Sequence, residues 1–188
     1  MKLYGSFTSP FVRHCRIALL EDNLDCEFIE TDFDASAQKS PTKKVPFLED
    51  GDIQLTDSAS ILMHLRQKAG KPFPENATDF NLFCEVNTIL DASVVLFFME
   101  KRDQLMPESS VYLTRNAARV DSALAHLNSQ NFSTAAPYSD GELRLACLLG
   151  WGVYRQRFTL DKYPQLQGFL EAVKKYAPFE ATTPPEGM

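Results

Sequence analysis

Three hydroxyl residues near the start of the chain are the first that could do chemistry. Thr8 and Ser9 follow a short apolar run, "KLYG", which contains Tyr4. A proline comes next, and residues 10–22 have the apolar spacing of a helix. Serine favours the position before a helix and proline fits its first turn. The sequence therefore predicts that the Ser9 hydroxyl lies at a helix N-terminus, with Thr8 and Tyr4 as the neighbouring hydroxyls.

Two further groups of residues could bind charged or peptide-like ligands. Lys44, Val45 and Pro46 end a polar stretch, and Pro46 would open an edge strand, where proline is tolerated. Asp57 and Ser58 begin an apolar-periodic stretch. The unpaired amides of a helix N-terminus can hold a carboxylate, and both residue types are also ordinary helix caps. Lys44 is either a solvated charge or the partner of an anion.

The elements around these residues alternate in type over the first seventy positions. A strand, a helix and a second strand precede a polar loop; a hairpin turning at Asp50-Gly51 and a further helix follow it. The expected ranges are strands 2–5 and 26–31, helices 10–22 and 57–69, and the loop and hairpin between 32 and 56. After a proline-containing linker at 70–78 the pattern is helical, at 79–102, 108–129, 140–157 and 164–176. The predicted fold class is an α/β domain, residues 1–69, followed by an all-helical domain, residues 79–188.

The overall composition excludes several classes of protein. The 188 residues are 44% hydrophobic and carry a net charge of −6, so no clustered basic face is available for nucleic acid or an anionic membrane. We find no stretch of ~20 consecutive apolar residues and no secretory signal. The four cysteines and three histidines are scattered without ligand spacing, which predicts no metal and no disulfide framework. We therefore expect a cytoplasmic protein.

The order of these elements resembles the thioredoxin fold, and the helical second half makes the chain resemble a cytosolic glutathione transferase of the serine-containing bacterial branch. "SPFVRHCRIALLE", "SPTKKVPFLEDG" and "LTDSASILMHL" carry the resemblance in the first half. In the second half a Ser139–Glu142 capping box and "YPQLQGFLEAVKKYAPFEATTPP" carry it. The resemblance implies a thioredoxin-like glutathione-binding domain followed by an all-helical domain.

The resemblance also implies roles for the residues that match the family's site. A cis Val45-Pro46 bond would let the Val45 backbone pair with the cysteinyl unit of glutathione. Ser58 would bind the γ-glutamyl carboxylate, Asp57 would face its ammonium group, and Lys44 would reach the glycine carboxylate. The loop departs from the family's "NPxGKVP" pattern, because Ser40 replaces Asn and Lys43 replaces Gly. These two replacements lead us to expect a loop of different shape before Val45.

Ser9 stands where thiol-exchanging relatives of this fold have a cysteine. A free thiol has a pKa near 8.5 and is only a few per cent thiolate at pH 7. A hydroxyl that donates to the sulfur favours the anion, whereas serine cannot form a mixed disulfide. The resemblance therefore implies that Ser9 activates glutathione, with Thr8 and Tyr4 as alternative donors.

The leading function from the sequence is a glutathione transferase that attacks small hydrophobic electrophiles, with glutathione as substrate, no metal and a homodimeric assembly. A glutathione-dependent reductase or isomerase would use the same thiol site. The alternative from another class is a non-catalytic protein of this fold that binds a macromolecular partner. The electrophile itself is not readable, because acceptor pockets are built from variable apolar residues.

Overall fold

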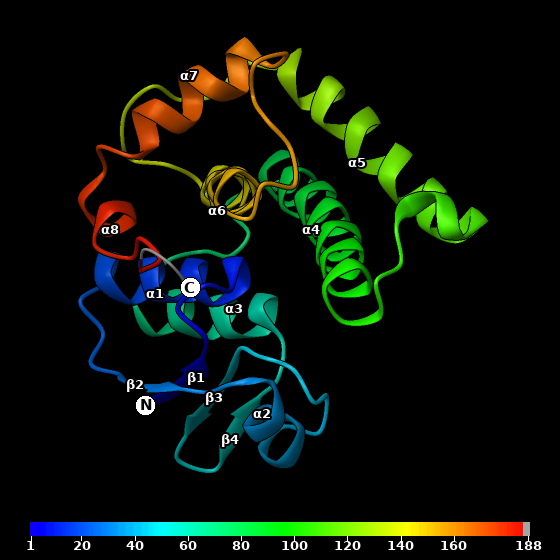
Figure 1. Cartoon of the computed structure of the whole chain (residues 1–188). Helices are drawn as coiled ribbons and strands as arrows, with labels where there is room; N and C mark the ends of the chain where they lie inside the picture. The colour runs from blue at the N-terminus through cyan, green and yellow to red at the C-terminus, as the bar shows by residue number, and fades with distance from the viewer. Residues whose placement is uncertain (186–188) are drawn as a thin grey trace. The chain divides into compact units, whose positions relative to one another are not determined.

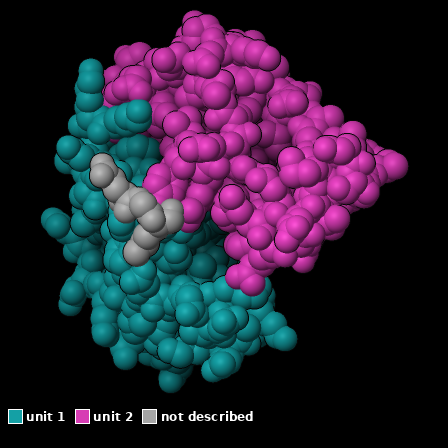
Figure 2. Space-filling view, in the orientation of Figure 1, with its two compact units in different colours: residues 1–76, 174–188 teal, residues 77–173 magenta. Residues whose placement is uncertain are grey.

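The computed structural model describes residues 1–185, and it divides into two compact units (Figure 2). Of the described residues, unit 1 contains 1–76 and 174–185, and unit 2 contains Ala77–Val173. The bounds predicted from the sequence, 1–69 and 79–188, assigned the last helical segment to the second domain; residues 186–188 lie outside the described range. Packing instead groups the described residues after Lys174 with unit 1, because they contact its first helix.

The sheet of unit 1 is mixed, as the sequence predicts. Its strands β1 (Lys2–Gly5), β2 (Glu27–Glu30), β3 (Phe47–Asp50) and β4 (Ile53–Leu55) lie in the order β2-β1-β3-β4. β1 pairs with β2 in parallel, whereas the β1–β3 and β3–β4 pairs are antiparallel. This arrangement confirms the thioredoxin-like fold of the N-terminal half.

Two helices cover one side of this sheet. α1 (Pro10–Glu21) and α3 (Ser58–Lys68) pack against each other (Figure 1). Their apolar residues meet those of the central strands in a core where Leu3, Ile17 and Leu62 are fully buried. Burying each such side chain contributes about 1.5–3 kcal/mol. This packing therefore holds both helices, and with them their first residues, in a fixed position on the sheet.

The segment expected as a polar loop contains a helix, α2 (Phe33–Lys39), which is a correction to the sequence prediction. The Asp32 carboxylate caps it by accepting a hydrogen bond from the Ala35 amide at 2.7 Å. Ser36 is the one buried residue of this helix, so the helix lacks the apolar stripe by which sequence patterns are found. A second short helix, α8 (Ala177–Glu180), was also not predicted.

Unit 2 consists of helices joined by loops, with no strand in residues 77–173, which confirms the second half of the predicted fold class. It contains α4 (Ala77–Asp103), the short 3₁₀ helix η1 (Pro107–Ser109), α5 (Val111–Asn128), α6 (Asp140–Tyr154) and α7 (Pro164–Val173). α4 packs against both α5 and α6, and α7 packs against α5 and α6. The core includes Phe83, Leu90, Leu124 and Leu148.

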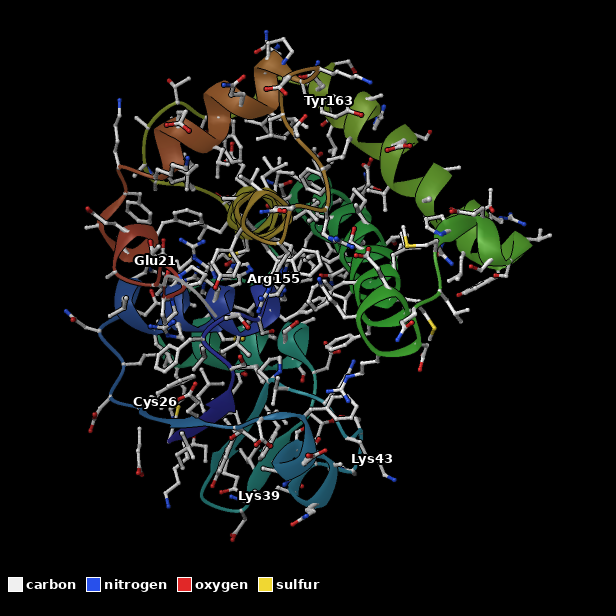
Figure 3. All side chains as sticks on the ribbon, viewed as in Figure 1. Glu21, Cys26, Lys39, Lys43, Arg155 and Tyr163 are labelled. Atoms are coloured by element: carbon white, nitrogen blue, oxygen red, sulfur yellow. The ribbon has the colours of Figure 1, made fainter. Side chains whose placement is uncertain are left out.

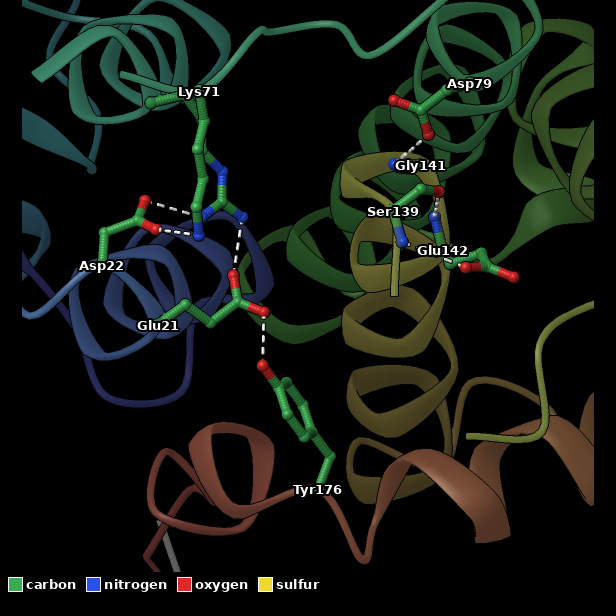
Figure 4. Close-up of polar contacts among 9 residues, drawn as sticks. Glu21, Asp22, Lys71, Asp79, Ser139, Gly141, Glu142 and Tyr176 are labelled. Carbon is green, nitrogen blue, oxygen red and sulfur yellow. Dashed lines mark hydrogen bonds and ion pairs between the residues drawn. The ribbon is translucent and has the colours of Figure 1, made fainter. Parts of the chain in front are cut away.

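The predicted capping box at the start of α6 is present. Ser139 accepts a hydrogen bond from the Glu142 amide at 3.2 Å, and Glu142 accepts one from the Ser139 amide at 3.0 Å (Figure 4). The Asp79 carboxylate adds a third bond, from the Gly141 amide at 2.8 Å. These bonds satisfy helix N-terminal amides that have no intrahelical partner, so they serve folding.

Among the described residues, α4 is the helix whose length and composition would allow it to span a membrane. An 18-residue window within it has a mean hydropathy of 1.7, and 33% of that window is buried. α4 has no unbroken apolar run of the kind sought in the sequence, because Asn87 and Asp91 interrupt it. Core helices pass the same test, and α4 provides Phe83 and Leu90 to the core of unit 2.

Candidate active site

Three segments of unit 1 meet at one end of its sheet. In the antiparallel register Tyr4 lies opposite Phe47, so the end of β1 is beside the start of β3. Leu48 lies opposite Leu55, so the end of β4 is beside the same start of β3. The residues that follow β1, precede β3 and follow β4 are therefore neighbours. These are the segments that contain Ser9, Val45-Pro46 and Asp57-Ser58.

Ser9 is the N-cap of α1, as predicted. Its hydroxyl oxygen accepts a hydrogen bond from the Val12 amide at 3.4 Å, and its carbonyl accepts one from the Arg13 amide at 2.9 Å. The side chain is half-buried. Within residues 1–185 the Ser9 hydroxyl proton is donated to no other group, so it can be donated to a ligand at the positive end of the α1 dipole.

The Tyr4 hydroxyl is already engaged. It donates to the Glu49 carboxylate at 2.8 Å, and its ring stacks on Phe47 with centroids 4.3 Å apart. The hydrogen bond to Glu49, together with burial, raises the pKa of Tyr4 to about 12. This geometry argues against Tyr4 as a donor to a thiol. The Thr8 hydroxyl lies 3.1 Å from the Ser6 hydroxyl, and either oxygen can be the donor.

The Val45-Pro46 bond is cis, as the resemblance implied. Pro46 is buried and Val45 is half-buried. In the described part of the chain neither the amide nor the carbonyl of Val45 makes a backbone hydrogen bond, and ladder pairing of β3 with β1 reaches only to Phe47. An extended peptide can therefore use both groups of Val45.

The loop before Val45 has a backbone that suits glycine at the position where this chain has lysine. Lys43 has a φ of +53°, and its amide donates to the Ser40 carbonyl at 2.9 Å. Lys43 is exposed, and it lies in the same part of unit 1 as Lys39 of α2 (Figure 3). Lys43, which replaces glycine in "SPTKKVP", therefore adopts the left-handed backbone conformation itself.

Lys43→Gly is expected to stabilise the protein by up to about 1 kcal/mol. A side chain in the left-handed region costs about 1–2 kcal/mol, and the greater freedom of glycine in the unfolded chain offsets part of that gain. Urea unfolding should show a higher midpoint with an unchanged slope. Lys43→Ala, which removes the charge but keeps Cβ, is the control. An equal gain in Lys43→Ala would attribute the effect to charge instead of backbone strain.

Asp57 and Ser58 differ in position and exposure at the start of α3. The Asp57 carboxylate caps the helix by accepting from the Ala59 amide at 2.9 Å, and Ser58 is the first helical residue. Asp57 is exposed, whereas Ser58 is only 4% exposed. Lys44 pairs with Asp57 at 3.5 Å, with both side chains more than half exposed. Such a surface pair contributes only about 0–1 kcal/mol, so a ligand bearing both charges can replace it at little cost.

Sequence reasoning missed two buried serines, Ser36 and Ser40, that support the loop before Val45. Ser36 of α2 is 2% exposed, and its hydroxyl donates to the Phe33 carbonyl at 2.8 Å and lies 3.5 Å from the Lys43 carbonyl. Ser40 is 4% exposed, and its hydroxyl lies 3.0 Å from that of Thr42. Small polar residues in a polar stretch give no sequence signal of burial. No cluster of three metal-ligating side chains occurs among residues 1–185.

Unit 1 thus combines a helix-capping serine, a cis-proline before β3 and an acid-serine pair at the start of α3 with a thioredoxin-like sheet. Residues 3–73 match the family model of the glutathione S-transferase N-terminal domain. A glutathione S-transferase of Triticum aestivum is 26% identical over 97% of this chain and 92% of its own length. These matches support a protein of the cytosolic glutathione S-transferase family.

Solved structures show the same fold. A glutathione transferase family member from Pseudomonas fluorescens Pf-5, with bound glutathione, has a TM-score of 0.84 at 23% identity and 98% coverage of both chains. A bacterial maleyl pyruvate isomerase, described as a zeta-class glutathione S-transferase, has a TM-score of 0.80 at 18% identity and full coverage of both. At these identities the likeness shows the fold alone.

Proposed function

We propose that this protein is a glutathione transferase that activates the glutathione thiol for attack on small hydrophobic electrophiles. The observation that carries the proposal is the meeting of Ser9, Val45-Pro46 and Asp57-Ser58 at one end of the unit 1 sheet. The match of residues 3–73 to the glutathione S-transferase N-terminal domain and the full-length relatives support it. Glutathione is the substrate in this proposal, and no step needs a metal.

The proposed site binds the tripeptide along its length. Val45 pairs its free amide and carbonyl with the cysteinyl unit of glutathione. The Ser58 hydroxyl and the N-terminal amides of α3 hold the γ-glutamyl carboxylate, and Asp57 faces the ammonium group. Lys44, once released from Asp57, reaches the glycine carboxylate. The cysteinyl sulfur then points to the end of β1, where Ser9 begins α1.

The proposed chemistry is a nucleophilic attack by sulfur. The Ser9 hydroxyl donates a hydrogen bond to the sulfur, which favours the thiolate, and the thiol proton leaves to solvent. The thiolate electron pair forms a carbon–sulfur bond with the electrophile. A leaving group departs with its bonding electrons, or an activated double bond takes up a proton. A pKa lowered by about two units corresponds to roughly 2.7 kcal/mol and makes the thiolate predominate at neutral pH.

Retention on immobilised glutathione, followed by elution with free glutathione, tests the binding part of the proposal. The ultraviolet absorbance of bound thiolate against pH then tests activation. A protein that passes through the column unretained and shows no bound thiolate is not a glutathione enzyme, and the partner-binding alternative takes its place. An isomerase would bind and activate glutathione but would not consume it, so the stoichiometry of thiol loss separates isomerisation from conjugation.

Ser58→Ala is expected to weaken glutathione binding by about 1–3 kcal/mol, the range for removing a partner from a buried polar group. Any loss of stability would come from other contacts of Ser58, because the capping bond is made by the Asp57 carboxylate. Titration calorimetry and thermal unfolding measure the two effects. Ser60→Ala, whose hydroxyl bonds the Asp57 carbonyl at 2.8 Å, is the matched control. Unchanged affinity in Ser58→Ala would remove this residue from the site.

We also propose that the protein is a homodimer. Unit 2 exposes large apolar side chains that its own helices do not cover, including Phe98 at 36%, Val111 at 88% and Tyr112 at 65% exposure. Exposed apolar surface of this kind marks interaction sites. Light scattering at micromolar concentration should give about twice the chain mass of 21.2 kDa. A monomer mass across that range would contradict the dimer.

A further inference from the structure

The C-terminal part of unit 1 lies along its first helix. We call residues 176–182 the C-terminal strap; they include the short helix α8, which lies beside α1 (Figure 1). The strap contacts α1 at two places about two helical turns apart, at Arg13 and at Glu21. Neither contact takes part in the proposed binding of glutathione.

The first contact is made by a buried arginine in the first turn of α1. The Arg13 Nη2 donates to the Phe179 carbonyl at 2.8 Å, and Nε donates to the Thr182 hydroxyl at 3.3 Å. The guanidinium carbon lies 3.6 Å from the centroid of the Phe179 ring. Arg13 is 5% exposed, Phe179 2% and Thr182 0%. Three contacts in a buried setting fix the side chain more tightly than a single surface ion pair would.

The second contact holds the other end of α1. The Tyr176 hydroxyl donates to the Glu21 carboxylate at 2.6 Å, and the other carboxylate oxygen accepts from Arg66 of α3 at 2.6 Å (Figure 4). Burial, and then the hydrogen bond to Glu21, raises the pKa of Tyr176. The tyrosine therefore stays protonated and remains a donor. The strap therefore holds α1 in its first turn, at Arg13, and at its last residue, Glu21.

Arg13 is joined directly to the residue proposed to activate the thiol. Its amide donates to the Ser9 carbonyl at 2.9 Å, and the preceding Val12 amide donates to the Ser9 hydroxyl at 3.4 Å. Any movement of the first turn of α1 therefore moves the Ser9 hydroxyl. Catalytic groups must be held within about 0.5 Å of their productive position.

We propose that the C-terminal strap, acting through Arg13, positions the first turn of α1 and with it the Ser9 hydroxyl. This inference rests on the proposed function of Ser9 and assigns Arg13 as a positioning residue. It connects residues more than 160 positions apart in the chain, Arg13 with Phe179 and with Thr182. Loss of the contact should change the activation of bound glutathione more than its affinity.

Two variants, Arg13→Gln and Thr182→Val, test the strap, and Arg13→Lys tests rescue. The control is Asn128→Ala, which removes a side-chain cap from α7 in unit 2, where Asn128 accepts from the Gln165 amide at 3.0 Å. In the strap variants, amide hydrogen exchange at Val12 and Arg13 should quicken by about tenfold relative to amides of α3. The pKa of bound glutathione should rise by about half a unit or more, with KM for glutathione within about threefold.

Arg13→Lys should restore part of the protection, because its ammonium can still donate to the Phe179 carbonyl. Asn128→Ala should lower Tm without changing either readout in α1. Strap variants that lose Tm as the control does, yet keep wild-type exchange at Val12 and Arg13, would overturn the proposal. If wild-type protein does not lower the thiol pKa at all, the proposed function fails, and the exchange measurement still decides whether the strap holds the turn that carries Ser9.

Discussion

Ser9→Ala is expected to reduce the rate of glutathione conjugation at neutral pH by about 10–100-fold, while glutathione affinity changes by less than about tenfold. The hydroxyl oxygen is already an acceptor for the Val12 amide, so its proton is available for the sulfur of a bound thiol. Removing it takes the proposed hydrogen bond from the thiolate but leaves the contacts proposed between the tripeptide and Val45 and Ser58.

The pH dependence of the lower conjugation rate in Ser9→Ala distinguishes a loss of thiol activation from damage to the site. Wild-type enzyme should hold bound glutathione with a pKa below the free value of about 8.5, and Ser9→Ala should move that pKa back towards it. The activity deficit should therefore shrink as the pH rises past the pKa of the free thiol, because the thiolate then forms without help. Ultraviolet absorbance of bound thiolate measures the shift directly.

Two controls separate the hydroxyl from the other roles of Ser9. Ser9→Gly keeps most of the capping stability, since glycine at an N-cap costs only a few tenths of a kcal/mol, but it also lacks the hydroxyl. It should lose activity as Ser9→Ala does while remaining more stable. Ser9→Cys should favour mixed disulfides and thiol exchange. Identical thiolate titrations in wild type and Ser9→Ala would assign activation to Thr8 instead.

The candidate site could be predicted from the sequence because each of its parts has a local signal. A serine followed by proline predicts a helix start, Asp50-Gly51 predicts the hairpin that returns β4 to the site, and Asp57 predicts a cap. Once the strand order is known, these local features come together at one end of the sheet. The structure places all three segments there, although their roles with glutathione stay a proposal.

The parts that could not be predicted lack a local signal. α2 is held by the Asp32 cap and by Ser36, without the apolar repeat that marks a helix. The contact between Arg13 and Phe179 joins distant positions, and an arginine on a helix ordinarily indicates a solvated charge. Because Lys43 replaces glycine, its loop was expected to have a different shape. Lys43 nevertheless adopts a positive φ, a conformation that favours glycine. Tertiary packing determines each of these features.

Arg66→Met is expected to destabilise the protein by about 3–5 kcal/mol, the range for breaking a buried ion pair by removing one partner. Arg66 donates to Asp22 at 2.7 Å and to Glu21 at 2.6 Å, and the three side chains are at most 10% exposed. Without the guanidinium, two carboxylates stay close together in a buried setting. Glu21 also holds Tyr176 of the C-terminal strap, so the loss should extend to the strap.

Lys71→Met is the matched control, because Lys71 contacts the same Asp22 carboxylate at 2.5 Å from a side chain that is 52% exposed. Its loss should cost less, about 1 kcal/mol, because the Lys71 ammonium is half exposed and the buried Asp22 carboxylate keeps Arg66 as its partner. Urea unfolding of the two variants at one pH measures the difference. Equal costs would show that burial does not distinguish the two cations. A loss in Arg66→Met well below the expected range would mean that solvent reaches Glu21 and Asp22 once the arginine is gone.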